Sequence, residues 1–124
     1  MKVKKADSGA IMAEIAVKGM QEKKAKSIVK IDLRKLNLSV ADYFIICHAE
    51  SDKQIDAIAD SVEDEIRNAT GEKPFSREGF RLSDWIILDY IDVVVHIFQR
   101  EKRNFYDLEA LWNDGEHKHY DDMN

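Results

Sequence analysis

The residues best suited to form a binding site lie in one stretch of the sequence, Asp84-Trp85-Ile86-Ile87-Leu88-Asp89-Tyr90-Ile91-Asp92. Its apolar residues predict strands that meet at a turn bearing Asp89, Tyr90 and Asp92, with Trp85 close by. Exposed aromatic rings beside carboxylates are typical of a protein-binding hot spot that faces Arg and Lys side chains. A tight acidic turn with Trp85 buried in the core explains the spacing equally well, so the residues alone leave both interpretations open.

The sequence carries few signals for catalysis or for a cofactor. It has no GxGxxG or P-loop spacing and no nucleophile elbow, so neither a phosphate cradle nor a serine nucleophile is predicted. Cys47 lies inside an apolar run and is expected to be an inert core residue. His96 alternates with Val94 and Phe98, which favours a satisfied, partly buried histidine.

A metal site is not expected either. His117 and His119, with Asp121 and Asp122, supply suitable ligand types, but they lie in a polar segment without an enclosing shell. We therefore expect no metal and no cofactor.

Charge is distributed unevenly along the chain. Residues 1–36 carry ten Lys/Arg against four Asp/Glu, whereas residues 37–124 carry nine against twenty, and the net charge is −5. An acidic surface repels phosphate, so the main part of the chain suits a basic protein partner better than bare nucleic acid. Solubility alone is the alternative explanation of the acidic balance.

The first half of the chain predicts two helices and two strands. A helix is expected over residues 9–26 with Ser8 as its N-cap, then a strand over 28–34, a turn through 37–39 and an apolar strand over 43–47. Ser51 precedes Gln54 at the capping-box spacing, which predicts a second helix that ends at Gly71.

The second half predicts three strands and a last helix. An edge strand or an irregular segment is expected near residues 73–78 because of Pro74, followed by a hairpin of 85–89 and 93–98. A helix over 101–113 is expected to bury Phe105, Leu108, Leu111 and Trp112. These elements predict a single α+β (α/β-like) domain spanning residues 1–124, with a mixed five-stranded sheet, a core at about 9–114 and a mobile polar tail at 115–124.

The sequence also predicts where the protein works. Its apolar runs are too short to span a bilayer, and no apolar stretch follows the basic residues near Met1. Cys47 is the only cysteine, which excludes an internal disulfide and favours a reducing compartment. A cytoplasmic location is therefore expected.

Four motifs in order resemble the Iojap-related ribosomal silencing factors over about residues 10–114. They are Asp42-Tyr43-Phe44-Ile45-Ile46-Cys47, the helix start Ser51-Asp52-Lys53-Gln54, Trp85-Ile86-Ile87-Leu88-Asp89-Tyr90-Ile91-Asp92-Val93-Val94-Val95-His96-Ile97-Phe98, and Arg103-Asn104-Phe105-Tyr106-Asp107-Leu108-Glu109-Ala110-Leu111-Trp112. One departure is visible, because Ile91 stands where this family usually has glycine, and an altered turn is expected there.

The resemblance implies a fold related to nucleotidyltransferases without their activity. It also implies binding to the fourteenth protein of the large ribosomal subunit at the intersubunit face, which blocks subunit joining and represses translation, and it implies self-association as a homodimer. The contact residues that it implies are Trp85, Asp89, Tyr90, Asp92, Asp42 and Tyr43. The +6 balance of residues 1–36 would permit residues 1–26 to touch ribosomal RNA.

Two alternatives stay open beside this function. A nucleotidyltransferase-like enzyme needs a Gly-Ser loop and paired carboxylates for magnesium, and the chain offers Asp32, Asp89 and Asp92 but no such loop. An acidic adaptor for some other basic protein is the second alternative.

Overall fold

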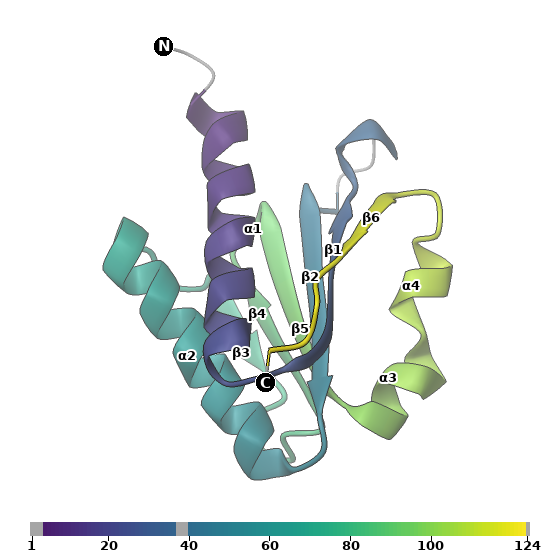
Figure 1. Cartoon of the computed structure of the whole chain (residues 1–124). Helices are drawn as coiled ribbons and strands as arrows, with labels where there is room; N and C mark the ends of the chain where they lie inside the picture. Colours follow the sequence, from purple (N-terminus) through teal and green to yellow (C-terminus); the bar gives the residue numbers. More distant parts are fainter. Residues whose placement is uncertain (1–3, 37–39, 124) are drawn as a thin grey trace.

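The computed structural model describes residues 4–36 and 40–123, in which one mixed sheet carries helices on both faces (Figure 1). The elements are α1 (Lys4–Glu22), β1 (Lys26–Asp32), the 3-10 helix η1 (Arg34–Leu36), β2 (Tyr43–Ala49), α2 (Asp52–Thr70), β3 (Ser76–Glu78), β4 (Trp85–Asp89), β5 (Val93–Gln99), α3 (Arg100–Tyr106), α4 (Leu108–Leu111) and β6 (Glu116–His119). The six strands run in the order β3-β4-β5-β2-β1-β6, and only the central pair β2 and β5 is parallel. The predicted α+β class with a mixed sheet is confirmed. The turn expected at residues 37–39 lies outside the described residues.

Helices α1 and α2 cover one face of the sheet (Figure 1). Ser51 caps α2, because its Oγ accepts the backbone N–H of Gln54 at 3.1 Å, and Gly71 ends the helix with a left-handed φ of 80°. Both predicted ends of this helix are confirmed. Helix α1 begins at Lys4, so Ser8 lies inside the helix and the prediction that it is the N-cap is wrong.

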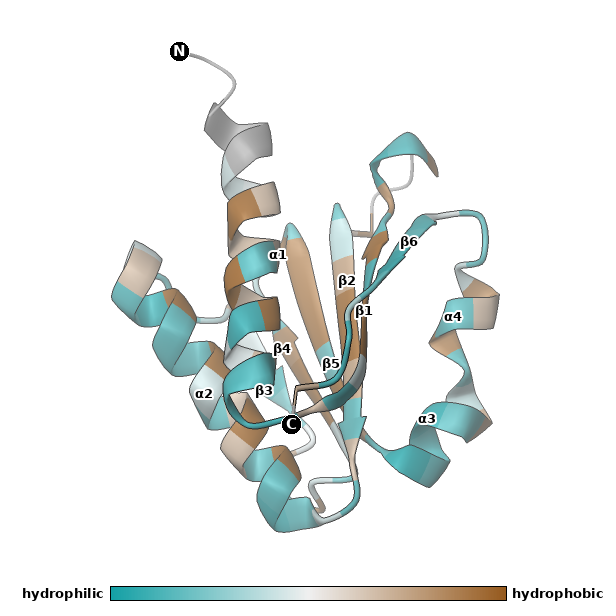
Figure 2. Cartoon of the chain, viewed as in Figure 1, coloured by the Kyte–Doolittle hydropathy of each residue, from teal (hydrophilic) through white to brown (hydrophobic). Residues whose placement is uncertain are grey.

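The two helices cross closely at Gly19. The hydroxyl of Ser61 on α2 donates a hydrogen bond of 2.7 Å to the Gly19 carbonyl. A Cβ atom at Gly19 would lie only 2.8 Å from the Cα of Val62. This contact locks α1 onto α2 and fixes the layer that covers the buried strands, which are the brown strands to the right of α1 in Figure 2.

Helices α3 and α4 lie on the opposite face (Figure 1), and here the single predicted helix over 101–113 is wrong. Asp107 adopts a left-handed φ of 48° and separates the two short helices. The break shifts the inward-facing side, so Leu108 is buried, while Phe105 is 78% exposed and Leu111 is 70% exposed. The predicted burial of Phe105 and Leu111 is therefore also wrong.

The sheet has six strands and not the expected five, because the last strand, β6, forms within residues 115–124, where a mobile tail was expected. It pairs antiparallel with β1 from Val29↔His119 to Asp32↔Glu116. Beyond it, Tyr120 donates a hydrogen bond from its hydroxyl to Glu14 of α1 at 2.6 Å. The strand is polar and mostly exposed because it lies at the edge of the sheet, so it lacks the apolar alternation by which a sequence reveals a strand.

Two further predictions concern Cys47 and membrane-spanning segments. Cys47 is fully buried in β2, and burial raises the pKa of its thiol to about 12, as expected for an inert core residue. No helix in the described part of the chain combines the length and apolar character that a membrane crossing requires.

Candidate protein-binding surface

Three acidic residues lie at one end of the sheet, and we call them the acidic rim: Asp42, Asp89 and Asp92. They lie at the same end because β2 and β5 start side by side and the antiparallel β4 ends at the same place. The Asp92 carbonyl accepts the backbone N–H of Asp42 at 2.8 Å, which ties these two positions together. The Asp89 carboxylate accepts the N–H of Ile91 at 2.8 Å and shapes the turn.

The acidic rim is available to a charged partner. All three residues are partly exposed, and none of them forms an ion pair with a described side chain, that is, one of residues 8–36 or 40–123. Carboxylates that keep an unpaired charge at the surface attract Lys and Arg side chains.

The two tyrosines of the predicted site are buried rather than exposed. Tyr43 is 3% exposed and Tyr90 is 6% exposed, and both pack in the core between the sheet and α1 and α2. Burial raises the pKa of both phenols above its ordinary value. Neither ring can therefore provide much contact area to a partner.

Trp85 lies at the opposite end of β4 from the acidic rim. It pairs with Phe98, whereas Asp89 pairs with Val94, so four residues of strand, or about 13 Å, separate Trp85 from Asp89. The structure therefore brings together the rim residues and separates Trp85 from them.

The Trp85 ring is held firmly in a partly exposed position. Its Nε1–H donates to Nδ1 of His96 at 3.2 Å, and its ring stacks on Phe98 with 4.8 Å between centroids. His96 is 6% exposed, and burial lowers its pKa to about 4, so the imidazole is neutral near pH 7 and Nδ1 can accept. Because the polar edge of the indole is used inside the protein, Trp85 offers a partner its apolar ring.

Strand β4 links Trp85 to the acidic rim along one open face. Ile86 and Leu88 point into the core, while the alternate residues Trp85, Ile87 and Asp89 are partly exposed on the other side. We call these three residues the β4 face. Sequence reasoning missed Ile87, although strict alternation with the buried Ile86 and Leu88 is a signal that could have identified it.

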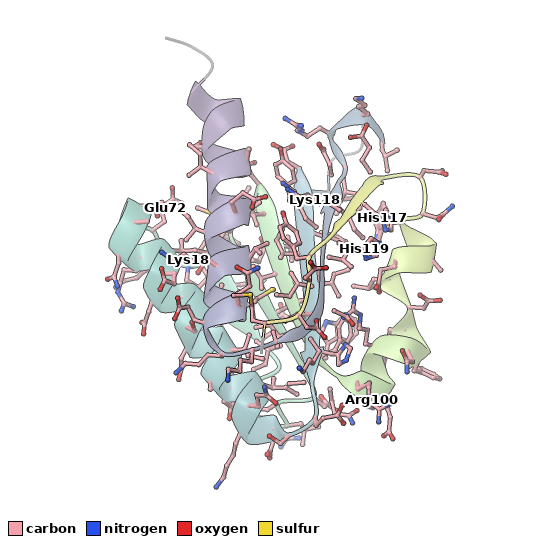
Figure 3. The ribbon with its side chains drawn as sticks, in the orientation of Figure 1. Lys18, Glu72, Arg100, His117, Lys118 and His119 are labelled. Atoms are coloured by element: carbon pink, nitrogen blue, oxygen red, sulfur yellow. The ribbon has the colours of Figure 1, made fainter. Side chains whose placement is uncertain are left out.

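The carboxylates considered for magnesium do not form a metal site. Asp32 is bound by Arg34 through two side-chain hydrogen bonds of 2.9 and 2.7 Å, and these bonds hold the pKa of its carboxyl below the usual range. His117 and His119 lie on β6 (Figure 3), and Nε2 of His117 bonds to the Trp112 carbonyl at 3.1 Å. Across the described residues, no group of three His, Cys, Asp or Glu side chains is placed to hold a metal ion.

Sequence comparison identifies relatives along nearly the whole chain. A family described as "Ribosomal silencing factor during starvation" matches residues 5–124. A ribosomal silencing factor of Bacillus subtilis is 42% identical over 101 residues, which cover 82% of this chain and 84% of the relative. The chloroplastic protein Iojap of Zea mays is 38% identical over 113 residues, covering 86% of this chain and 47% of that protein.

Two solved structures share the fold. A protein from Chromobacterium violaceum superposes with a TM-score of 0.79 at 31% identity, covering 84% of this chain and 85% of that chain. A protein from Bacillus halodurans superposes with a TM-score of 0.68 at 35% identity, covering 80% of this chain and 90% of that chain.

Proposed function

This chain belongs to the ribosomal silencing factor family, and we propose that it binds the large ribosomal subunit at its intersubunit face and blocks joining of the small subunit. The proposed receptor is the fourteenth protein of the large subunit, and the consequence is repression of translation in the cytoplasm. The mechanism needs only occupancy, because a protein seated on the joining surface excludes the other subunit sterically.

The observation that supports the contact site best is the open β4 face beside the unpaired acidic rim. Trp85 and Ile87 supply apolar area, while Asp89 and Asp92 supply charge for the Lys and Arg side chains that a basic protein presents. Since a few large residues such as Trp carry most of the binding energy in protein interfaces, we assign Trp85 as the anchor and the rim as its electrostatic complement.

We propose binding rather than catalysis as the activity. Asp32 is engaged by Arg34, and the carboxylates of the acidic rim are proposed to meet cations of a protein rather than magnesium. Incubation with ATP or GTP and magnesium should therefore give no nucleotide transfer or hydrolysis above a blank without protein. Hydrolysis or transfer of at least one nucleotide per protein molecule would contradict this part of the proposal.

Two further contacts are proposed within the same function. Residues 1–26 are proposed to approach ribosomal RNA because of their positive charge, and the side chains of residues 1–7 lie outside the described ones. Because deleting residues 1–26 would also remove α1 from the core, the test replaces exposed lysines of this segment. Changing Lys18, Lys23 and Lys24 to Ala should weaken binding and flatten its salt dependence. Self-association as a homodimer is proposed as well, and analytical ultracentrifugation tests it.

The deciding experiment is co-sedimentation with separated ribosomal subunits. We expect the native chain to pellet with large subunits only, and an Asp89→Lys, Asp92→Lys double variant to bind at least tenfold more weakly, or about 1.4 kcal/mol. The control is Asp60→Lys, Asp64→Lys on the outer face of α2, because it changes the net charge equally at exposed positions.

Outcomes of this experiment separate the function from the site. If the rim variant binds as tightly as the control, the function stands and the contact lies elsewhere. If the native chain binds neither subunit, the proposed function is wrong. Because Asp89 also accepts the Ile91 N–H, an Asp89→Asn variant that keeps the acceptor oxygen checks that a loss reflects charge rather than a broken turn.

A further inference from the structure

The end of α3 carries a row of aromatic rings that reaches from the β4 face to solvent, and we call Trp85, Tyr106 and Phe105 the aromatic row. The Tyr106 ring contacts Trp85 at 4.6 Å between centroids, and the Phe105 ring meets Tyr106 edge-on at 5.0 Å. Tyr106 is 45% exposed and Phe105 is the most exposed large apolar side chain among the described residues. The row therefore extends the candidate surface from the sheet onto α3.

The exposure of Phe105 follows from the backbone. Asp107 in its left-handed conformation ends α3 directly after Tyr106. Adjacent residues of a helix point about 100° apart, so Phe105 and Tyr106 cannot both face the core. Contiguous apolar rings left at the surface are typical of interaction sites.

Helix α3 is held rigidly against the sheet beneath this row. The Arg103 side chain is buried, and it donates to Glu109 at 2.7 Å and to Nδ1 of His48 on β2 at 2.9 Å. A partner that docks on Phe105 and Tyr106 thus meets a preorganised helix and does not have to order it, which favours affinity.

The charges around the row indicate the kind of partner. Each of the three cations of α3 is already in an ion pair: Arg100 (Figure 3) with Glu50 at 3.0 Å, Lys102 with Asp84 at 3.8 Å, and Arg103 with Glu109 at 2.7 Å. Glu101 and Asp107 are exposed and form no ion pair with the side chains of residues 8–36 and 40–123. Phosphate is therefore repelled from the row, whereas Arg and Lys side chains are attracted.

We propose that Phe105 and Tyr106 form a second half of the contact with the basic ribosomal protein, in which its Arg side chains stack on their rings. Guanidinium groups bind aromatic faces through cation–π interaction and stacking. The inference rests on the proposed function, since the partner is the same, but it adds a surface on α3 to the β4 face.

Direct titration of purified large subunits with labelled protein tests the inference. We expect Phe105→Ala to weaken binding at least fivefold. The matched control is Leu111→Ala on α4, which removes an exposed apolar side chain of similar exposure outside the row and should leave binding within twofold. Phe105 is the decisive position because its ring contacts Tyr106 and not Trp85, so its removal spares the anchor.

Three outcomes overturn the inference. If the native chain binds large subunits and Phe105→Ala binds equally well, the row is not a contact while the proposed function survives. If the native chain does not bind, both fall. If Phe105→Ala weakens binding to large subunits but not to the isolated fourteenth ribosomal protein, which the native chain binds, the row contacts RNA or another component instead.

Discussion

Ile91 holds a backbone conformation that favours glycine, so replacing it with glycine should stabilise the protein. Its φ is 77°, and the Asp92 N–H bonds to the Tyr90 carbonyl at 3.0 Å, which makes Ile91 the centre of a three-residue turn between β4 and β5. Positive φ is a genuine outlier for a β-branched residue, and such a turn is rare and strained.

The size of the effect follows from opposing contributions. A sparsely populated backbone conformation costs roughly 1–3 kcal/mol. The substitution to glycine also lowers the free energy of unfolding by about 0.5–1 kcal/mol, because glycine gives the unfolded chain more conformational freedom. Because Ile91 is 55% exposed, little packing is lost with its side chain. We expect Ile91→Gly to raise the free energy of unfolding by about 1 kcal/mol and Tm by roughly 3–5 °C.

Urea and thermal unfolding measure the change, with Ile91→Ala as the control. Alanine removes the same side chain atoms beyond Cβ but keeps most of the positive-φ penalty, so it should gain clearly less than glycine. If both variants gain equally, the effect comes from the exposed side chain and not from the backbone. If Ile91→Gly is less stable than the native chain, the strain argument is refuted.

Three other stability effects can be measured by urea unfolding. Gly19→Ala should lower the free energy of unfolding by about 3 kcal/mol, because the added Cβ would lie 2.8 Å from the Val62 backbone and α1 must shift to accept it. A loss below about 0.5 kcal/mol would contradict the close crossing of α1 and α2. Ser51→Ala should lower the free energy of unfolding by about 1 kcal/mol, because the Gln54 N–H loses its hydrogen-bond acceptor. Ser51→Asp should keep the stability of the native chain, because its carboxylate can accept the same N–H. Burial lowers the pKa of His96 from 6.5 in the unfolded chain to about 4, so the folded state favours the neutral imidazole. The contribution of His96 to the free energy of unfolding is therefore fully present above about pH 6.5 and is lost as the pH falls towards 4. A His96→Gln variant should lose less stability than the native chain over this range, and parallel pH profiles would contradict the assignment.

Elements with strong local signals were predictable from the sequence. Helix α2 has its cap, its apolar stripe and its terminal glycine within one continuous segment, residues 51–71, so each feature reinforces the others. The hairpin of β4 and β5 is similarly local. The edge position expected near Pro74 is confirmed, since β3 lies at one end of the sheet order.

Elements decided by tertiary contacts were not predictable. The apolar period across residues 101–113 fits one helix, but Asp107 takes a left-handed conformation and only the packed structure shows the break. Strand β6 forms because β1 offers it a free edge, and its own residues carry no strand pattern. Both errors arise where pairing or packing partners far away in the sequence outweigh local preference.

The candidate site also combines residues that the sequence identifies with an arrangement that only the structure shows. This arrangement favours an extended contact with a partner. Trp85, Asp89 and Asp92 form one motif in the sequence, but Trp85 lies at one end of β4 and the two carboxylates lie at the other end. The indole and the carboxylates therefore cannot bind the same side chain of a partner. The hydrogen bond from Trp85 to His96 leaves only apolar ring area for a partner, while Asp89 and Asp92 carry charge that no described side chain pairs. An interface with separate apolar and ionic regions suits a broad, basic protein surface better than a small ligand. Variants at the two regions should then lower affinity independently, and additive losses in a double-mutant cycle would distinguish this surface from a single compact pocket.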